Sequence, residues 1–117
     1  MKENVLLDKS FKFAVRIVKL SQYLQKDKKE FILSKQILRS GTSIGAMVRE
    51  AQHAESTKDF IHKLNIVLKE ANETEYWLLL LKEGNYISEK ELESIHPAIE
   101  ELLKLLISII KSNKKKL

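Results

Sequence analysis

Apolar and small side chains recur along residues 60–81 at alternating spacings of four and three positions, without a break. The members of this stripe are Phe60, Leu64, Val67, Ala71, Thr74, Leu78 and Leu81. Such a heptad pattern keeps one face of an α-helix apolar over about six turns. It favours packing against other helices at a shallow crossing angle, so the chain is predicted to form a helical bundle.

Three other segments show helical periodicity, which predicts four helices at about residues 5–26, 34–54, 57–83 and 88–112. The central stripe of the first is expected to be Leu7, Phe11, Ala14, Val18 and Ser21, widened by Leu6, Phe13, Ile17, Leu20 and Leu24. The stripe of the last is expected to be Leu92, Ile95, Ile99, Leu102, Leu106 and Ile109. Further apolar residues make the last helix wider than one core face requires, which favours self-association.

The residues between the periodic segments indicate where helices begin and end. Ser34, Ser56 and Ser88 are predicted to cap the second, third and fourth helices, since serine accepts hydrogen bonds from the first backbone amides. Residues 25–33 are expected to form a solvated connection. Gly84 is expected to follow the end of the third helix, where a left-handed residue is common.

Short connections make successive helices antiparallel. Pro97 is expected either to kink the fourth helix or to mark its true start. At 117 residues the chain is long enough to bury one core. The predicted fold class is therefore all-α, an up-down-up-down antiparallel four-helix bundle in a single domain over residues 1–117.

Gly41 and Gly45 stand four residues apart inside the second predicted helix. Each costs roughly 1 kcal/mol relative to alanine in such a position. Two of them on one helix indicate close packing against another backbone, or a local bend. The surrounding Ser-Gly-Thr-Ser-Ile-Gly segment is not a phosphate-binding loop, because it lacks the Gly-Lys-Ser/Thr ending and no strand precedes it.

The chain contains no cysteine, which excludes disulfides and thiolate metal sites and is typical of a reducing compartment. The N-terminus lacks the apolar stretch of a signal peptide. No apolar run approaches the roughly 20 residues that span a bilayer. A cytoplasmic protein without a membrane partner is expected.

The formal net charge is +5, which suits a nucleic-acid or anionic-surface partner. All but three of the basic residues are lysine, however, and a lysine-rich composition can also arise without any function. One face of the first helix carries regularly spaced cations, here called the basic seam: Lys9, Lys12, Arg16, Lys19 and Lys26. It extends over more than about 20 Å. The basic seam is the predicted nucleic-acid-binding site.

Two Glu-x-x-His patterns, Glu50 to His53 and Glu93 to His96, have the spacing found in carboxylate-bridged di-metal bundles. Both lie off the predicted core stripes, and the first helix offers no acid in its middle. Solvated surface residues are the favoured interpretation, and a di-metal enzyme is a remote alternative. No nucleophile–base pair or nucleotide loop is present, so neither catalysis nor a cofactor or metal is expected.

A denser polar and aromatic cluster occupies residues 70–77, within the third helix. It forms either a binding patch or a set of hydrogen bonds between helices or subunits. The second interpretation is favoured, because buried polar groups are usually hydrogen-bonded. A pairing of Glu50 or Glu73 with Arg39 or Arg49 is expected, together with a partner for the Trp77 indole N–H.

The segments R-S-G-T-S-I-G-A-M-V-R-E-A (residues 39–51) and F-I-H-K-L-N-I-V-L-K-E-A-N-E-T-E-Y-W-L (residues 60–78) resemble the 23S ribosomal RNA intervening-sequence proteins, a family of bacterial four-helix bundles. Many members have asparagine where this chain has Met47, so a polar contact expected there would be missing. A related branch, the accessory protein of diversity-generating retroelements, forms a basic pentameric barrel that binds a reverse transcriptase and nucleic acid.

The resemblance implies a homopentamer without an established catalytic site. With Gly41 added from its spacing, the expected packing or assembly positions are Ser43, Ile44, Gly45, Glu50, Glu70, Glu73, Tyr76 and Trp77. The combined prediction is a non-enzymatic basic bundle that binds RNA, DNA or a nucleoprotein partner such as a reverse transcriptase. The alternative is a protein-interaction scaffold whose lysines only keep it in solution.

Overall fold

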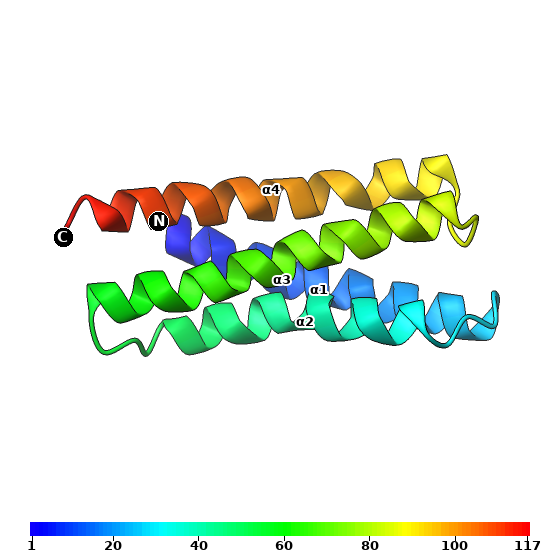
Figure 1. Cartoon of the computed structure of the whole chain (residues 1–117), viewed down its shortest axis with the longest axis horizontal. Helices are drawn as coiled ribbons and strands as arrows, with labels where there is room; N and C mark the ends of the chain where they lie inside the picture. The colour runs from blue at the N-terminus through cyan, green and yellow to red at the C-terminus, as the bar shows by residue number, and fades with distance from the viewer.

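The computed structural model describes all 117 residues, and every regular element in it is an α-helix. The helices are α1 (Lys2–Lys26), α2 (Leu33–Ala51), α3 (Thr57–Glu83) and α4 (Glu89–Lys114). They run alternately up and down, and both chain termini lie at the same end of the molecule (Figure 1). Each helix packs against two neighbours, α1 against α2 and α4, and α3 against α2 and α4. The predicted four-helix bundle is confirmed.

Both ends of α3 and the C-terminal end of α1 lie at the predicted residues, and the other helix ends differ from the predicted bounds by one to three residues. The second helix ends at Ala51 rather than at residue 54, since the chain must turn before Ser56 caps α3. The fourth continues through Pro97 from Glu89, so the alternative start at Pro97 is wrong. Charged residues interrupt every helix, and none offers an apolar stretch that would span a lipid bilayer.

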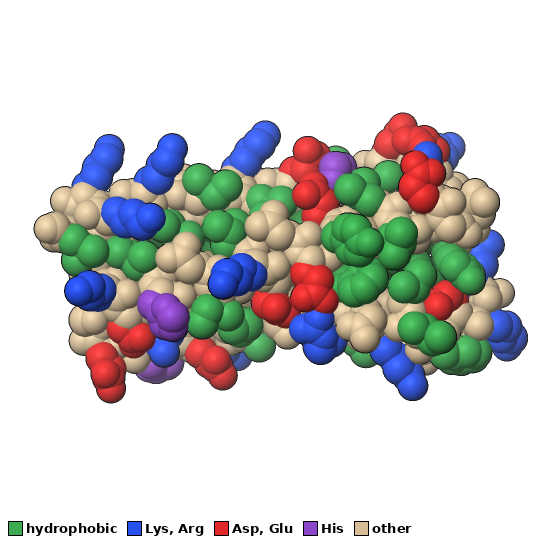
Figure 2. All heavy atoms as spheres, in the orientation of Figure 1, with side chains coloured by type: hydrophobic (Ala, Val, Ile, Leu, Met, Phe, Trp, Pro, Cys, Tyr) green, Lys and Arg blue, Asp and Glu red, His purple; other side chains and the backbone are tan.

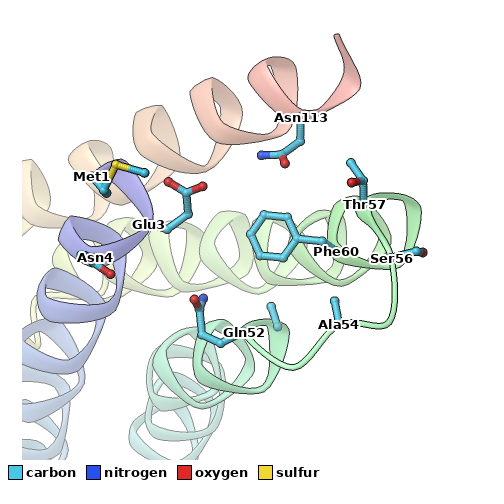
Figure 3. Close-up of a pocket in the computed structure, with 10 residues that line it drawn as sticks. Met1, Glu3, Asn4, Gln52, Ala54, Ser56, Thr57, Phe60 and Asn113 are labelled. Atoms are coloured by element: carbon cyan, nitrogen blue, oxygen red, sulfur yellow. The ribbon is translucent and has the colours of Figure 1, made fainter. Parts of the chain in front are cut away.

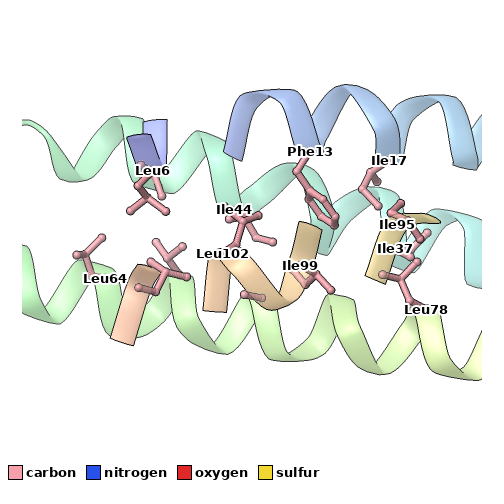
Figure 4. Close-up of a cluster of buried hydrophobic side chains, with 14 of the residues drawn as sticks. Leu6, Phe13, Ile17, Ile37, Ile44, Leu64, Leu78, Ile95, Ile99 and Leu102 are labelled. Carbon is pink, nitrogen blue, oxygen red and sulfur yellow. The ribbon is translucent and has the colours of Figure 1, made fainter. Parts of the chain in front are cut away.

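The core is one cluster of 22 buried apolar side chains, contributed by all four helices and, through Ile87, by the α3–α4 connection. Figure 4 shows part of this cluster. Six of the seven residues in the predicted α3 stripe are buried; Phe60 is half-buried, and Ile61 is buried instead. All six of the α4 stripe are buried. The 3.6-residue period therefore identifies the inward face of these two helices correctly.

The predicted central stripe of α1 is wrong, because the helix is rotated. Phe11 is 63% exposed and Val18 is 40% exposed. Ser21 of that stripe is buried, and so are four of the five residues expected to widen it. The inward face is formed by Leu6, Ser10, Phe13, Ile17, Ser21 and Leu24. The apolar arc of α1 is wide enough for either stripe to face the core. The rotation places small Ser10 and Ser21 where the neighbouring helix α2 comes close.

The glycines of α2 explain that rotation. A Cβ atom on Gly45 would lie 3.2 Å from the carbonyl oxygen of Ser10, and one on Gly41 would lie 2.8 Å from Cγ1 of Ile17. Real Cβ atoms rarely or never come so near a neighbour. The predicted close approach of another backbone is confirmed at Gly45, where it is the backbone of α1, whereas Gly41 lies against the side chain of Ile17.

Glu30 corrects the prediction for the first connection. It was expected to be solvated, but it is only 8% exposed. Its carboxylate accepts hydrogen bonds from the backbone N–H groups of Ser34, at 2.8 Å, and Ile32, at 3.2 Å. Ile32 is the N-cap of α2 and its side chain makes no cap hydrogen bond, so the predicted Ser34 cap is wrong. Glu30 supplies the acceptor that the first amides of α2 require.

The other helix starts agree with the sequence. The Ser88 hydroxyl accepts a hydrogen bond from the Glu91 N–H at 3.0 Å, and the Glu91 carboxylate accepts one from the Ser88 N–H at 2.8 Å. This is a complete capping box. The Ser56 hydroxyl likewise accepts from the Asp59 N–H at 3.0 Å.

The turn after α3 uses a different residue from the predicted one. Gly84 has a negative φ of −81°, whereas Asn85 is left-handed with φ 66°. The Asn85 N–H donates to the Lys82 carbonyl at 3.0 Å, and the Tyr86 N–H donates to the Leu81 carbonyl at 2.9 Å. This is the pair of hydrogen bonds that defines a Schellman motif, with asparagine in the position usually taken by glycine.

Candidate functional site

The basic seam lies on α1 along its contact with α4. Lys9 Nζ is 3.1 Å from the Glu101 carboxylate of α4. Arg16 donates two hydrogen bonds to Ser94 of α4, one to its carbonyl oxygen and one to its hydroxyl, each at 3.0 Å. The seam is therefore the α1 wall of a groove between the two helices.

The remaining members of the seam face outward. Lys12 Nζ is 3.0 Å from the carboxylate of Asp8, one turn earlier on the same helix. Lys19 and Lys26 are exposed, and no carboxylate lies within 4.0 Å of either ammonium group.

The ion pairs of the seam are weak because both partners remain in contact with water. The side chains of Lys9 and Glu101 are 41% and 50% exposed. Exposed pairs of this kind contribute about 0–1 kcal/mol. Arg16 is held by neutral groups, so its positive charge is uncompensated. The seam is thus a line of cations that an incoming anion could engage without breaking a strong contact.

Two adjacent cavities hollow the groove beside the seam. The larger, of about 310 Å³, has Arg16, Lys19 and Tyr23 of α1 on one side and Glu91 and Ser94 of α4 on the other. Its apolar lining residues are Leu20, Ile87 and Ile95. The smaller, of about 160 Å³, is lined by Lys9, Lys12, Phe13, Arg16, Ala98 and Glu101. Arg16 borders both, so the two are sections of one α1–α4 groove.

The polar cluster of α3 joins that helix to α2. Arg39 donates hydrogen bonds to the carboxylates of Glu70, at 2.9 Å, and Glu73. The Trp77 indole N–H donates to the same Glu73 oxygen at 2.9 Å. The predicted Arg39–Glu73 pair and the predicted partner for Trp77 are both confirmed. Arg49 and Glu50 form no ion pair. The cluster links α2 to α3.

One buried contact between these helices was not foreseen. Thr74 Oγ1 is 2.9 Å from Ser40 Oγ, and both side chains are fully buried. Thr74 Oγ1 also bonds the Glu70 carbonyl oxygen at 2.8 Å. The signal in the sequence is a hydroxyl residue inside an apolar stripe, because a buried hydroxyl requires a partner.

The other expected packing or assembly positions fall into two groups. Ile44 is fully buried in the core, and the Ser43 hydroxyl donates to the Arg39 carbonyl at 2.6 Å. Glu50 and Tyr76 are exposed. The Tyr76 ring meets the Trp77 ring edge to face, with centroids 5.3 Å apart. Tyr76 is thus available to another molecule.

Several large apolar side chains are exposed on α1 and α3. On α1 they include Phe11, Val15 and Val18, and on α3 they are Tyr76, Leu79 and Leu80. Figure 2 shows apolar side chains gathered over the C-terminal half of α3. The sequence predicted surplus apolar surface on α4, but Ile107 is the one large apolar residue of that helix that is strongly exposed. The uncovered surface therefore lies on other helices than expected.

The two Glu-x-x-His patterns do not converge. Glu50 of α2 and Glu93 of α4 are exposed, and His53 is exposed in the turn that follows α2. His96 instead contacts two other carboxylates, with its Nε2 2.8 Å from Glu75 and its Nδ1 3.5 Å from Glu100. No group of three histidine or carboxylate side chains is arranged to hold a metal ion.

The largest cavity, of about 450 Å³, opens at the end of the bundle that carries the chain termini (Figure 3). Glu3, Gln52, Phe60 and Asn113 are among its lining residues, so all four helix ends contribute. Glu3 is its one charged side chain. The lining offers no nucleophile beside a base, and no sequence pattern indicated this cavity.

Comparison with known proteins gives a consistent result. The sequence profile of the 23S rRNA-intervening sequence protein family matches residues 2–108. A crystal structure from Bacteroides thetaiotaomicron, described as a protein of unknown function from the S23 ribosomal protein family, is 63% identical. The similarity covers 95% of this chain and 99% of that one, with a TM-score of 0.93. Comparison with functionally curated proteins finds no match. The chain belongs to the 23S rRNA-intervening sequence protein family.

Proposed function

We propose that this protein is a non-enzymatic, homopentameric bundle that binds nucleic acid through the basic seam. The observation that carries the proposal is the position of the seam along one wall of the α1–α4 groove, with its cations weakly paired or unpaired. A line of cations of this kind can bind the phosphates of a nucleic acid, and such contacts do not depend on the base sequence.

The carboxylates along the groove do not neutralise the positive charge of the basic seam. Glu101 is paired with Lys9, and Glu91 is engaged in the capping box of α4. Because the Lys9–Glu101 pair is exposed to solvent, exchanging its carboxylate for a phosphate costs little. Arg16 keeps its charge while Ser94 fixes its direction, so it is preorganised for an anion.

Assembly of several copies would strengthen the positive electrostatic potential that the basic seams produce. The exposed apolar groups around Phe11 and around Tyr76 lie on different helices, α1 and α3. Contact between two such unlike surfaces is head to tail, and head-to-tail contacts that close form a ring. Five copies would carry about +25, five times the charge of the chain. Light scattering is expected to give five times 13.6 kDa, about 68 kDa.

A charge-reversal triple variant tests the seam directly. Lys12, Arg16 and Lys19 are changed to Glu together, and binding to a fluorescent RNA oligonucleotide is measured at low salt. The matched control reverses Lys35, Lys58 and Lys69, which are exposed, lie outside the groove and pair with no carboxylate. We expect at least a tenfold loss of affinity in the seam variant beyond that of the control. Equal affinities in the two variants would rule out the seam as the binding site.

A protein-interaction scaffold is the second candidate function. The exposed apolar residues Tyr76, Leu79 and Leu80 favour it, since contiguous apolar surface usually marks an interface with another protein. This alternative predicts no binding to RNA or DNA even at low salt. The same titration therefore separates the two candidates.

A further inference from the structure

We infer that the α1–α4 groove selects single-stranded over double-stranded nucleic acid, by seating one unpaired base in the larger cavity beside Tyr23. The inference rests on the proposed nucleic-acid binding and adds the form of the ligand. The basic seam alone would attract any polyanion, whereas the cavity beside it offers an apolar and aromatic surface on which only an unstacked base can pack.

The cavity has an apolar lining next to an aromatic side chain. Ile87 and Ile95 are almost fully buried, and Leu20 is half-buried beside them. Tyr23 borders the same space, and its hydroxyl makes no hydrogen bond within the protein. The flat face of a base is apolar enough to stack on such a ring, and aromatic stacking is the common device of single-strand binding. A volume of about 310 Å³ suits a small planar group.

Cations stand where the flanking phosphates of that base would lie. Arg16 and Lys19 border the cavity, and Lys12 lies one helical turn before Arg16 on α1. Lys12 and Lys19 are separated by about 10 Å along the helix. A strand following the seam can thus meet cations on both sides of the seated base.

The polar rim can hydrogen-bond the edge of a base. One oxygen of Glu91 accepts the Ser88 N–H, which leaves the other oxygen of that carboxylate free as an acceptor. The Ser94 hydroxyl borders the same cavity. In a duplex the base faces are stacked and the edges are paired, so these groups would meet only the backbone. The cavity therefore adds affinity for a single strand alone.

The test compares a 12-nucleotide single-stranded RNA with its matched duplex, using the intact chain. The variant Tyr23→Leu keeps an apolar side chain in the cavity but removes the ring, and Tyr23→Phe keeps the ring. The control Phe31→Leu removes an exposed ring in the connection between α1 and α2, outside the groove. Circular dichroism checks that each variant remains helical.

We expect the wild type to bind the single strand at least about tenfold more tightly than the duplex. Tyr23→Leu should lose at least about fivefold on the single strand, with little change on the duplex or in salt dependence. Tyr23→Phe and Phe31→Leu should behave like the wild type. A 2-aminopurine base in the strand should be quenched by the wild type and not by Tyr23→Leu.

Equal affinity for single strand and duplex, or an unchanged Tyr23→Leu, would overturn the inference. In either of those cases, weaker binding of both ligands by the seam variant with Glu at positions 12, 16 and 19 would show that the seam binds nucleic acid. The proposed function would then stand, and only the base-seating cavity would be rejected. Absence of any binding at low salt would overturn both together.

Discussion

Gly45 of α2 lies so close to Ser10 of α1 that a Cβ atom at position 45 would be 3.2 Å from the Ser10 carbonyl oxygen. This contact sets the rotation of α1 about its own axis. It turns Ile17 toward the core and leaves Phe11 on the outside. The same rotation presents the basic seam along α4, so a packing contact of α2 determines where the cations of α1 lie.

A large side chain at Gly45 should therefore separate α1 from α2. Gly45→Leu is expected to lower the free energy of unfolding by at least about 2 kcal/mol, because overpacking against a backbone cannot be relieved by a rotamer change. The neighbouring control Ala46→Leu introduces the same final side chain at an exposed position and should change the free energy of unfolding by less than about 0.5 kcal/mol. Urea unfolding followed by circular dichroism measures both. Equal effects would show that the close contact is absent.

Glu73 links Arg39 to the indole of Trp77. Glu73→Ala is expected to cost about 1–2 kcal/mol, since it removes one hydrogen bond and one half-exposed ion pair. Glu70→Ala, which removes only the second partner of Arg39, should cost less. Trp77 is the only tryptophan, so its emission reports the loss of its hydrogen bond during urea unfolding. A larger effect at Glu70 than at Glu73 would contradict this account.

Glu30 should stabilise the start of α2 although it lies outside the helix. Glu30→Ala removes the acceptor for the Ser34 and Ile32 amides and is expected to cost about 1–2 kcal/mol, as the loss of a helix cap does. Asp27→Ala, in the same connection but exposed, serves as the control. Hydrogen exchange of the first amides of α2 should accelerate in the Glu30 variant only. Unchanged exchange would argue against the cap.

Acid should weaken the start of α3 through Asp59. The hydrogen bond from the Glu55 backbone N–H is the main cause that lowers the pKa of Asp59 below its ordinary value of 3.8, and Lys63 adds a smaller attraction. The ionised carboxylate therefore stabilises the folded state above that ordinary value, and this stabilisation is lost as the pH falls through the folded pKa. Asp59→Asn should be less stable than the wild type at pH 7, with the difference shrinking below about pH 4. A difference that stayed constant from pH 7 to pH 2 would contradict this.

The sequence predicts the class of fold well and the orientation of one helix badly. On α3 and α4 the regularly spaced stripe is the buried one, so periodicity identifies the inward face, although both helices carry further apolar residues outside it. On α1 apolar residues occupy most of the circumference, and two stripes compete. The choice between them depends on where α2 comes close, which is a tertiary property that periodicity does not contain.

The candidate site was predictable as a line of charges but not as a groove. The spacing of Lys9, Lys12, Arg16, Lys19 and Lys26 shows that they share a face of α1. Ser94 and the cavity beside Tyr23 become visible only when α4 is placed next to α1. Glu30 was missed for a similar reason, because a charged residue in a lysine-rich connection looks solvated until its backbone partners are known.

The salt dependence of RNA binding tests the central claim most directly. Affinity for a single-stranded RNA would be measured by anisotropy from 50 to 300 mM salt, for the wild type and for the seam variant with Glu at positions 12, 16 and 19. Each phosphate engaged on a single strand contributes about −0.7 to the slope of log affinity against log salt. The account predicts a wild-type slope steeper than about −2, for three or more phosphates, and a much shallower slope in the variant. Absence of binding at 50 mM salt, or identical slopes for the two proteins, would contradict it.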